Sequence, residues 1–190
     1  MEQNELASRL IYKNGDTGLC LLSEAELSGN YPRWFCDYAV NQHNSHWNRP
    51  SVFKNVNVFV EGLMDDSSKI VFAVYAIKDA VHIGNVSLQS IDNMNQTAEI
   101  AFLFGEKNYW GKGYATDSAN LIIEHAFKHL NLNRIYLGCL CKNTAMNKLA
   151  LRLGFKEEGK RRQALFSEGE FHDVIEYGLL KNEFSAYSNC

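Results

Sequence analysis

Two glycines that flank a lysine stand between an apolar run and a helical pattern, and this order suits a bound phosphate. The run is Ala98–Phe104, and Gly111, Lys112 and Gly113 follow it. One face of a helix is then marked by apolar residues at Ala119, Ile122, Ile123, Ala126, Phe127 and Leu130. The first N–H groups of a helix lack partners within it and its dipole is positive there, so a phosphate fits where glycines leave room. We therefore predict a phosphorylated ligand at this helix N-terminus.

Two common phosphate loops do not match the spacing. A Walker A loop has four residues between its glycines and Ser or Thr after its lysine, whereas five residues separate Gly105 from Gly111 and Gly113 follows Lys112. The dinucleotide fingerprint would need a glycine at Thr116 and an earlier βαβ unit. Taken alone, the loop also fits a tight strand-to-helix connection that binds nothing.

A third kind of loop matches better. W-G-K-G-Y-A, residues 110–115, resembles the coenzyme A loop Q/R-x-x-G-x-G/A of the GNAT acetyltransferases, with Trp110 where Gln or Arg is usual. Three more segments resemble the branch of ribosomal-protein and nucleotide-sugar N-acetyltransferases: Y-P-R-W-F-C-D-Y-A-V (31–40), I-G-N-V-S-L (83–88) and N-T-A-M-N-K-L-A-L-R-L-G-F (143–155). The final stretch, 157–180, resembles the terminal hairpin of that branch. The resemblance covers nearly the whole chain and is strongest over Ile83–Leu180.

This resemblance implies a fold and a co-substrate. The fold would be the GNAT fold, of α/β (α+β) class: a mixed, mostly antiparallel twisted sheet with helices on both faces and a splay between two central parallel strands. Residues 1–190 would form a single acetyltransferase domain. The activity implied is N-acetyltransfer from acetyl-CoA to a primary amine, without a metal.

The cofactor contacts implied by the resemblance are mostly made by backbone groups. The pantetheine amides would pair with Ile100–Phe104, and the pyrophosphate would sit on the N–H groups of Gly111–Thr116. The full set of expected cofactor residues is Ile100, Phe102, Leu103, Phe104, Trp110, Gly111, Lys112, Gly113, Tyr114, Ala115, Thr116, Asn143 and Asn147.

Acetyl transfer needs a base for the amine, a donor for the oxyanion and a proton for the thiolate. Glu99, at the start of the central strand, is the candidate base, although an exposed strand-end carboxylate is an equal alternative. A backbone N–H near Phe102 or Leu103 is the usual oxyanion donor in the family. Ala150 stands where many GNAT enzymes have a tyrosine acid, so Asn143, Tyr114 or water would have to serve the leaving group.

The acceptor amine is the least determined part of the prediction. Trp34, Trp47 and Arg162 suggest a nucleotide-linked amino sugar, because they offer stacking surfaces and a cation; Arg162 could equally lie on a solvated strand. His172, in the same hairpin, is a candidate proton relay or an exposed histidine. The alternatives are a protein N-terminal acetyltransferase, similar to those of ribosomal proteins, and a non-catalytic acyl-CoA-binding module.

The elements that must position these residues follow from local patterns. We predict hairpins around Asn14–Asp16, between Ile70–Ile77 and Val81–Ser90, and at Glu168–Gly169. Helices are expected from Ser23 to near Gly29, from Pro32 with Trp34, Phe35, Tyr38 and Ala39 inside, within Asn48–Gly62, and from the Asn143–Thr144 cap to Gly154. A strand is expected at Arg134–Leu140.

Composition excludes several classes of function. With 46% hydrophobic and 22% charged residues, the chain is of globular type, and its net charge of −3 argues against a nucleic-acid partner. A polar N-terminus and apolar runs too short to span a bilayer predict a cytoplasmic protein without a membrane partner. Five scattered cysteines make no disulfide framework, and His43 and His46 lack a third metal ligand. A homodimer is possible.

Overall fold

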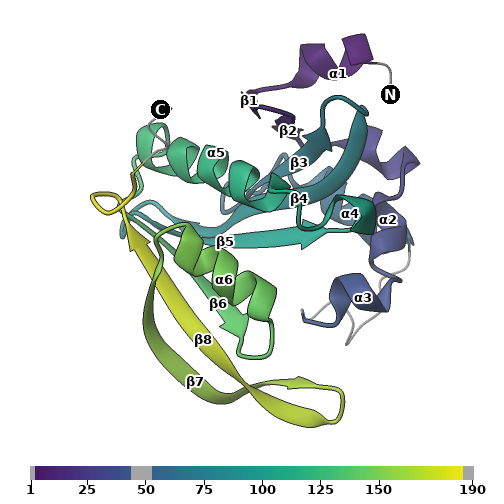
Figure 1. Ribbon diagram of the computed structural model, residues 1–190. Coiled ribbons are helices and arrows are strands. Elements are labelled where there is room, and N and C mark those ends of the chain that lie inside the picture. The colour runs from purple at the N-terminus through teal and green to yellow at the C-terminus, as the bar shows by residue number, and fades with distance from the viewer. Residues whose placement is uncertain (1–2, 44–52, 186–190) are drawn as a thin grey trace.

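The computed structural model describes residues 3–43 and 53–185, with the backbone alone at positions 53 and 54. A single sheet runs through this part of the chain in the order β1-β2-β3-β4-β5-β6-β8-β7 (Figure 1). Its strands are β1 (Tyr12–Asn14), β2 (Thr17–Leu21), β3 (Ile70–Ala76), β4 (Val81–Asp92), β5 (Thr97–Phe104), β6 (Arg134–Leu140), β7 (Lys156–Ser167) and β8 (Glu170–Leu180). Only the β5–β6 pair is parallel within this sheet.

Helices cover both faces of the sheet. They are α1 (Gln3–Arg9), η1 (Glu24–Ser28), α2 (Tyr31–Trp34), α3 (Tyr38–Asn41), α4 (Phe53–Gly62), η3 (Lys107–Tyr109), α5 (Tyr114–Lys128) and α6 (Thr144–Arg152). None of the helices in the described ranges has the length and apolar character that crossing a bilayer requires.

Strand β3 shows how the two hydrophobic layers arise. Successive strand residues point to opposite faces. Phe72 and Val74 join the cluster under α5 and α6, whereas Val71, Ala73 and Tyr75 join the cluster with α1, α2 and α4. The expected mixed, mostly antiparallel sheet with helices on both faces is therefore confirmed.

The centre of the sheet splits between β5 and β6. The two strands pair at only three positions, Thr97 with Arg134, Ala98 with Ile135 and Glu99 with Tyr136. Beyond Glu99 they diverge, so the edge of β5 that faces β6 is left open along its second half. This is the expected splay between two parallel strands.

The helix expected from Pro32 is two short helices, which corrects the sequence-based prediction. Asp37 interrupts the segment in extended conformation and its carboxylate accepts from the Ala39 N–H, which starts α3 as a new helix. Tyr38, expected inside, is 41% exposed. The N-terminal helix α1 was not predicted either, and it ends at Arg9, before the first hairpin begins.

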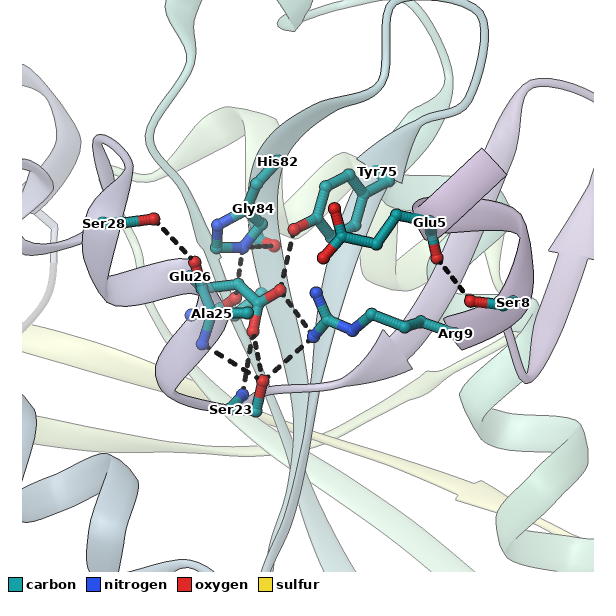
Figure 2. A network of polar contacts seen from close by, with 11 residues as sticks. Glu5, Ser8, Arg9, Ser23, Ala25, Glu26, Ser28, Tyr75, His82 and Gly84 are labelled. Carbon is teal, nitrogen blue, oxygen red and sulfur yellow. Dashed lines mark hydrogen bonds and ion pairs between the residues drawn. The ribbon is translucent and has the colours of Figure 1, made fainter. Parts of the chain in front are cut away.

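A buried polar network joins the N-terminal elements to the sheet (Figure 2). The Glu26 carboxylate, 2% exposed, accepts from the Tyr75 hydroxyl at 2.7 Å and from the Ser23 N–H at 2.9 Å, and pairs with Arg9 at 2.8 Å. His82 stacks on Tyr75 with ring centroids 5.3 Å apart. The network therefore fixes α1 and η1 against β3 and β4.

Candidate active site

The splay between β5 and β6 opens into a cleft of about 740 Å³. Its walls come from β5, from β6, from the N-terminus of α5 and from α6; the sequence-predicted cofactor residues among its lining are Ile100, Phe102, Phe104, Trp110, Gly111, Gly113, Tyr114, Ala115, Thr116 and Asn143. Residues from three separate motifs thus meet at one cavity, as the phosphate-loop interpretation requires.

The glycine loop has the backbone that the sequence suggested. Gly111 and Gly113 have φ of +73° and +96°, a region that side chains disfavour, and a Cβ added at either would meet no atom within 4 Å. Gly113 precedes the first residue of α5; its carbonyl accepts from the Thr116 and Asp117 N–H groups, whereas the N–H groups of Tyr114 and Ala115 come before the first hydrogen bonds of the helix. The loop therefore offers an open, positive surface of N–H groups to the cleft.

Trp110, at the family's Gln/Arg position, has a contact of its own. Its Nε1 donates to the Phe104 carbonyl at 3.0 Å, which ties the loop to the end of β5. Lys112 lies with its Nζ 5.3 Å from the ring centre of Tyr109 and is not part of the cleft lining.

The two asparagines of α6 differ in their availability. Asn143 lines the cleft and caps the helix, with Oδ1 accepting from the Met146 N–H at 3.1 Å. Asn147 lines neither cavity; its amide nitrogen donates to the carbonyl of Leu140 and its Oδ1 accepts from the Tyr177 hydroxyl. Asn147 therefore holds the β6–α6 turn and is committed to the protein.

A second cavity of about 580 Å³ adjoins the cleft, and its floor is the face of the sheet that α4 covers. The two cavities share His43, Glu99, Ala101, Phe102, Gly138 and Leu140. Leu103, expected to contact the cofactor, lines this second cavity instead. A group bound in the cleft and a group bound in the second cavity would meet beside Glu99.

The surroundings of Glu99 favour a protonatable carboxyl. Burial raises the pKa of Glu99, the nearby charge of Glu176 raises it further, and the charge of Arg161 opposes them. Arg161 itself is held by Glu176, with Nε 2.5 Å from Oε1. Since a base works best when its pKa approaches the working pH, this shift is in the direction that catalysis needs.

Neither Tyr114 nor the residue at position 150 is well suited to donate a proton to the thiolate leaving group. The Tyr114 hydroxyl donates to Asp16 at 2.7 Å, and burial together with this bond raises the pKa of Tyr114 to about 12. Ala150 is fully buried in the core. Of the three candidates that the sequence offered, Asn143 and water remain.

Trp34 does not reach either cavity, which corrects its expected role as an acceptor contact. It is 3% exposed, and its Nε1 donates to Glu106 at 3.1 Å. Its ring packs on Gly105, where an added Cβ would lie 2.0 Å from a ring atom. Trp34 therefore supports the turn after β5 from beneath.

The other expected acceptor residues lie elsewhere. Arg162 is exposed and lines neither cavity, whereas its neighbour Arg161 lines the second one. His172 lines neither; its Nε2 is 3.1 Å from the Ser167 carbonyl and 3.2 Å from Lys142 Nζ. Trp47 is outside the described residues.

Sequence reasoning missed three polar residues of β4 that line the second cavity, Asn85, Ser87 and Gln89. A signal was present, because polar and apolar residues alternate from Asn85 to Gln89. Such alternation normally predicts a solvent-facing side, so its buried location could not be read from the pattern. No group of three or more His, Cys, Asp or Glu side chains in residues 3–43 and 53–185 is placed to hold a metal.

Comparisons with known proteins agree with this geometry. Residues 19–156 match the family model described as the acetyltransferase (GNAT) domain. An uncharacterized N-acetyltransferase p20 of Bacillus licheniformis is 30% identical over 74% of this chain and 86% of its own length. A putative ribosomal N-acetyltransferase YdaF of Bacillus subtilis is 38% identical over 53% of this chain, and the match spans only 55% of that relative.

Among solved structures, a spermidine N-acetyltransferase from Vibrio cholerae in complex with CoA and spermine superposes with a TM-score of 0.81 and 24% identity, over 90% of this chain and 98% of that one. A ribosomal L7/L12 acetyltransferase in complex with coenzyme A has the same TM-score at 19% identity, over 90% and 97% of the two chains. These likenesses establish the fold. With most of the chain matched by the family model, the protein belongs to the GNAT acetyltransferase family.

Proposed function

We propose that this protein transfers an acetyl group from acetyl-CoA to a primary amine of a small molecule. One observation carries the proposal: Glu99 lies where the β5–β6 cleft meets the second cavity. The cleft fits coenzyme A, because it offers the open β5 edge to an extended pantetheine chain and glycine N–H groups to a pyrophosphate. The second cavity then takes the acceptor.

The chemistry follows from that placement. The amine nitrogen attacks the thioester carbonyl and passes a proton to Glu99, a backbone N–H of β5 near Phe102 or Leu103 donates to the oxyanion, and the C–S bond then breaks. Water protonates the thiolate, since the Tyr114 hydroxyl is engaged by Asp16 and the Asn143 amide can donate a hydrogen bond but no proton. The products are the N-acetylated amine and coenzyme A, and Glu99 releases its proton to solvent.

The acceptor proposed from the sequence, a nucleotide-linked amino sugar, has lost two of its supports. Trp34 is in the core and Arg162 is outside both cavities, so neither offers a stacking surface or a cation to a nucleotide. The relatives and similar structures named above point to two other acceptors, a ribosomal protein and the polyamine spermidine. The homodimer stays a prediction; one similar structure, a spermidine N-acetyltransferase from Vibrio cholerae, is described as dodecameric.

The test is acetyl-CoA consumption with a panel of amines, using the wild type and Glu99→Gln. If Glu99 is the base, the substitution keeps the shape of the side chain and removes its basicity, so kcat should fall by roughly 10²-fold or more. Acetyl-CoA affinity, measured by calorimetry, should stay the same. Binding without turnover in the wild type would instead indicate a non-catalytic acyl-CoA-binding protein, and a variant within threefold of wild type would leave the proton to a water relay.

A further inference from the structure

Strand β4 presents three uncharged polar side chains to the second cavity, Asn85, Ser87 and Gln89. They are every second residue, so they share one face of the strand, while Val86 and Leu88 between them are buried on the face that α5 covers. Asn85 and Ser87 are each only 5% exposed. We refer to these three residues as the polar row.

The polar row leads directly to the candidate base. In the β4–β5 register, Asn85 is opposite Leu103, Ser87 is opposite Ala101 and Gln89 is opposite Glu99. Paired residues of neighbouring strands have side chains on the same face. The row and Glu99 therefore form one continuous floor of the cavity, and Glu99 also lines the cleft.

Two members of the row keep unused hydrogen-bonding capacity. The Gln89 amide nitrogen donates to Ser87 Oγ at 3.0 Å, which leaves the Ser87 O–H and the Gln89 carbonyl for a ligand. The Ser87 hydroxyl and the Gln89 amide belong to the floor of the cavity, so folding removes part of the water around them. Losing those hydrogen bonds to water costs free energy unless another partner replaces them. A ligand with both donors and acceptors would supply such a partner.

His82 fixes the orientation of the third member. Its Nε2 is 2.9 Å from the Gly84 carbonyl and 2.8 Å from Asn85 Oδ1. A backbone carbonyl only accepts, so Nε2 carries the hydrogen and Asn85 receives it through oxygen. The bond between His82 and Gly84 is visible in Figure 2. The Asn85 amide is therefore held in one orientation beside the cavity.

The remaining walls are mostly apolar, with Tyr31, His43 and Asn55 as further polar residues, and they carry little free charge. Phe35, Phe59, Val71 and Val174 line the side walls. Among the described lining residues, Glu99 is the one carboxylate, and the one Lys or Arg side chain, Arg161, is already paired with Glu176. An extended polyamine would need further carboxylates for its additional cations, and a diphosphate would need an unpaired cation.

From the polar row we propose that the acceptor is a hydroxylated ring amine, of the amino-sugar class without a nucleotide, whose hydroxyl groups bond Ser87 and Gln89. Its apolar ring face would lie on the phenylalanines, and its amine would point at Glu99. This inference rests on the acetyltransferase function proposed above and adds the class of acceptor and the residues that select it.

The experiment compares glucosamine with cyclohexylamine, a ring amine of similar size that has no hydroxyl groups. The two amines differ in basicity, so their rates are compared within each protein. The preference is kcat/KM for glucosamine divided by kcat/KM for cyclohexylamine, and it is measured in the wild type and in the Ser87→Ala/Gln89→Met variant. Losing two hydrogen bonds to hydroxyls should make the preference of the variant at least tenfold lower than that of the wild type, through a higher KM for glucosamine. The single variant Ser87→Thr, which keeps the hydroxyl, should retain most of the wild-type preference.

Spermidine and a short peptide with a free N-terminus complete the panel, and calorimetry with acetyl-CoA checks that the double variant keeps its fold. A ratio unchanged by the double variant would overturn the inference, and so would a wild type that prefers spermidine or the peptide over glucosamine by tenfold or more; in both cases acetyl transfer itself would stand. Absence of acetyl transfer to all four amines would overturn the proposed function and this inference with it.

Discussion

Glu99 lies among charges that act on it in opposite directions, and this makes its role testable. Its carboxylate is half-buried, with Glu176 raising its pKa and Arg161 lowering it. Glu176 and Arg161 come from the terminal hairpin, which is far from Glu99 in sequence; β8 pairs with β6, and both side chains lie beside Gly138. The hairpin therefore adjusts the pKa of the candidate base in addition to lining the second cavity.

Replacing Glu176 and replacing Arg161 should move the acid limb of the pH–rate profile in opposite directions. Glu176→Gln removes a like charge, which favours the Glu99 carboxylate, so its pKa falls and activity persists to lower pH. Arg161→Gln removes the opposite charge, so the pKa of Glu99 rises. As the pH is lowered, the activity of this variant should therefore decline at a higher pH than that of the wild type. The measurement is kcat/KM for the amine between pH 4 and pH 8 in the two variants and the wild type.

The neighbouring Arg162→Gln is the matched control for Arg161→Gln, because Arg162 is exposed and lines neither cavity. Its profile should coincide with that of the wild type. If both arginine variants shift the acid limb equally, the effect comes from overall charge, and the local pairing described here would be incorrect.

The choice between Arg161 and Arg162 also shows a limit of prediction from sequence. Alternation along a strand places adjacent residues on opposite faces but does not say which face meets the cavity. The register of β7 with β8 shifts between Arg161 and Leu165, where Gln163 has a φ of +51°. That irregularity depends on the pairing of two whole strands, so no local pattern reveals it.

At the scale of elements, the β5–loop–α5 unit was predictable because each of its parts has a local cause. The apolar run predicts β5, the tight turn before the helix requires the positive φ that glycine allows, and the helical period predicts α5. The strand over Arg134–Leu140 and the Asn143 cap of α6 were likewise correct. What failed depended on contacts distant in sequence: the role of Trp34 comes from Gly105, more than seventy residues away, through a packing contact that leaves no trace in either segment.

The glycine loop gives the prediction at this scale. Gly113→Val places a β-branched side chain at a φ of +96° and in open space on the ligand side of the loop. If the pyrophosphate binds there, acetyl-CoA affinity should fall at least tenfold, about 1.4 kcal/mol, by calorimetry.

Gly113→Val also strains the backbone, and a control must separate this strain from the loss of acetyl-CoA affinity. Gly169→Val offers the comparison, because Gly169 has a φ of +82°, an added Cβ there also meets nothing within 4 Å, and the residue lies in the β7–β8 turn. It should lower stability in the same way without weakening acetyl-CoA binding. Equal affinity of Gly113→Val and the wild type would place the phosphates elsewhere.

On the scale of the whole molecule, the second cavity depends on elements that are joined through Glu26. Its carboxylate links Arg9 of α1 and Ser23 before η1 to Tyr75 of β3, as Figure 2 shows. Tyr75 stacks on His82, which holds Asn85 in the polar row. Residues 3–28, none of which lines the cleft, therefore support the floor on which an acceptor would lie.

The stability of this arrangement should depend on pH in a defined direction. Burial alone would raise the pKa of Glu26, but the hydrogen bonds from Tyr75 and Ser23 and the charge of Arg9 outweigh it, so the folded pKa is lowered. A carboxyl with a depressed folded pKa stabilises the protein above its unfolded pKa, and the contribution is lost as pH falls through the folded value. Glu26→Gln should thus lower the free energy of unfolding by about 3 kcal/mol near pH 7, because Arg9 loses its buried partner.

Urea unfolding followed by circular dichroism at several pH values measures this difference. The gap between the wild type and Glu26→Gln should be widest near neutral pH and should close as the pH is lowered, since the wild-type carboxylate is then protonated as well. Glu24→Gln is the matched comparison in the same 3₁₀-helix, because Glu24 is exposed and the change should cost little. A gap that is independent of pH, or equal to that of Glu24→Gln, would mean that the charge of Glu26 does not hold the N-terminal elements to the sheet.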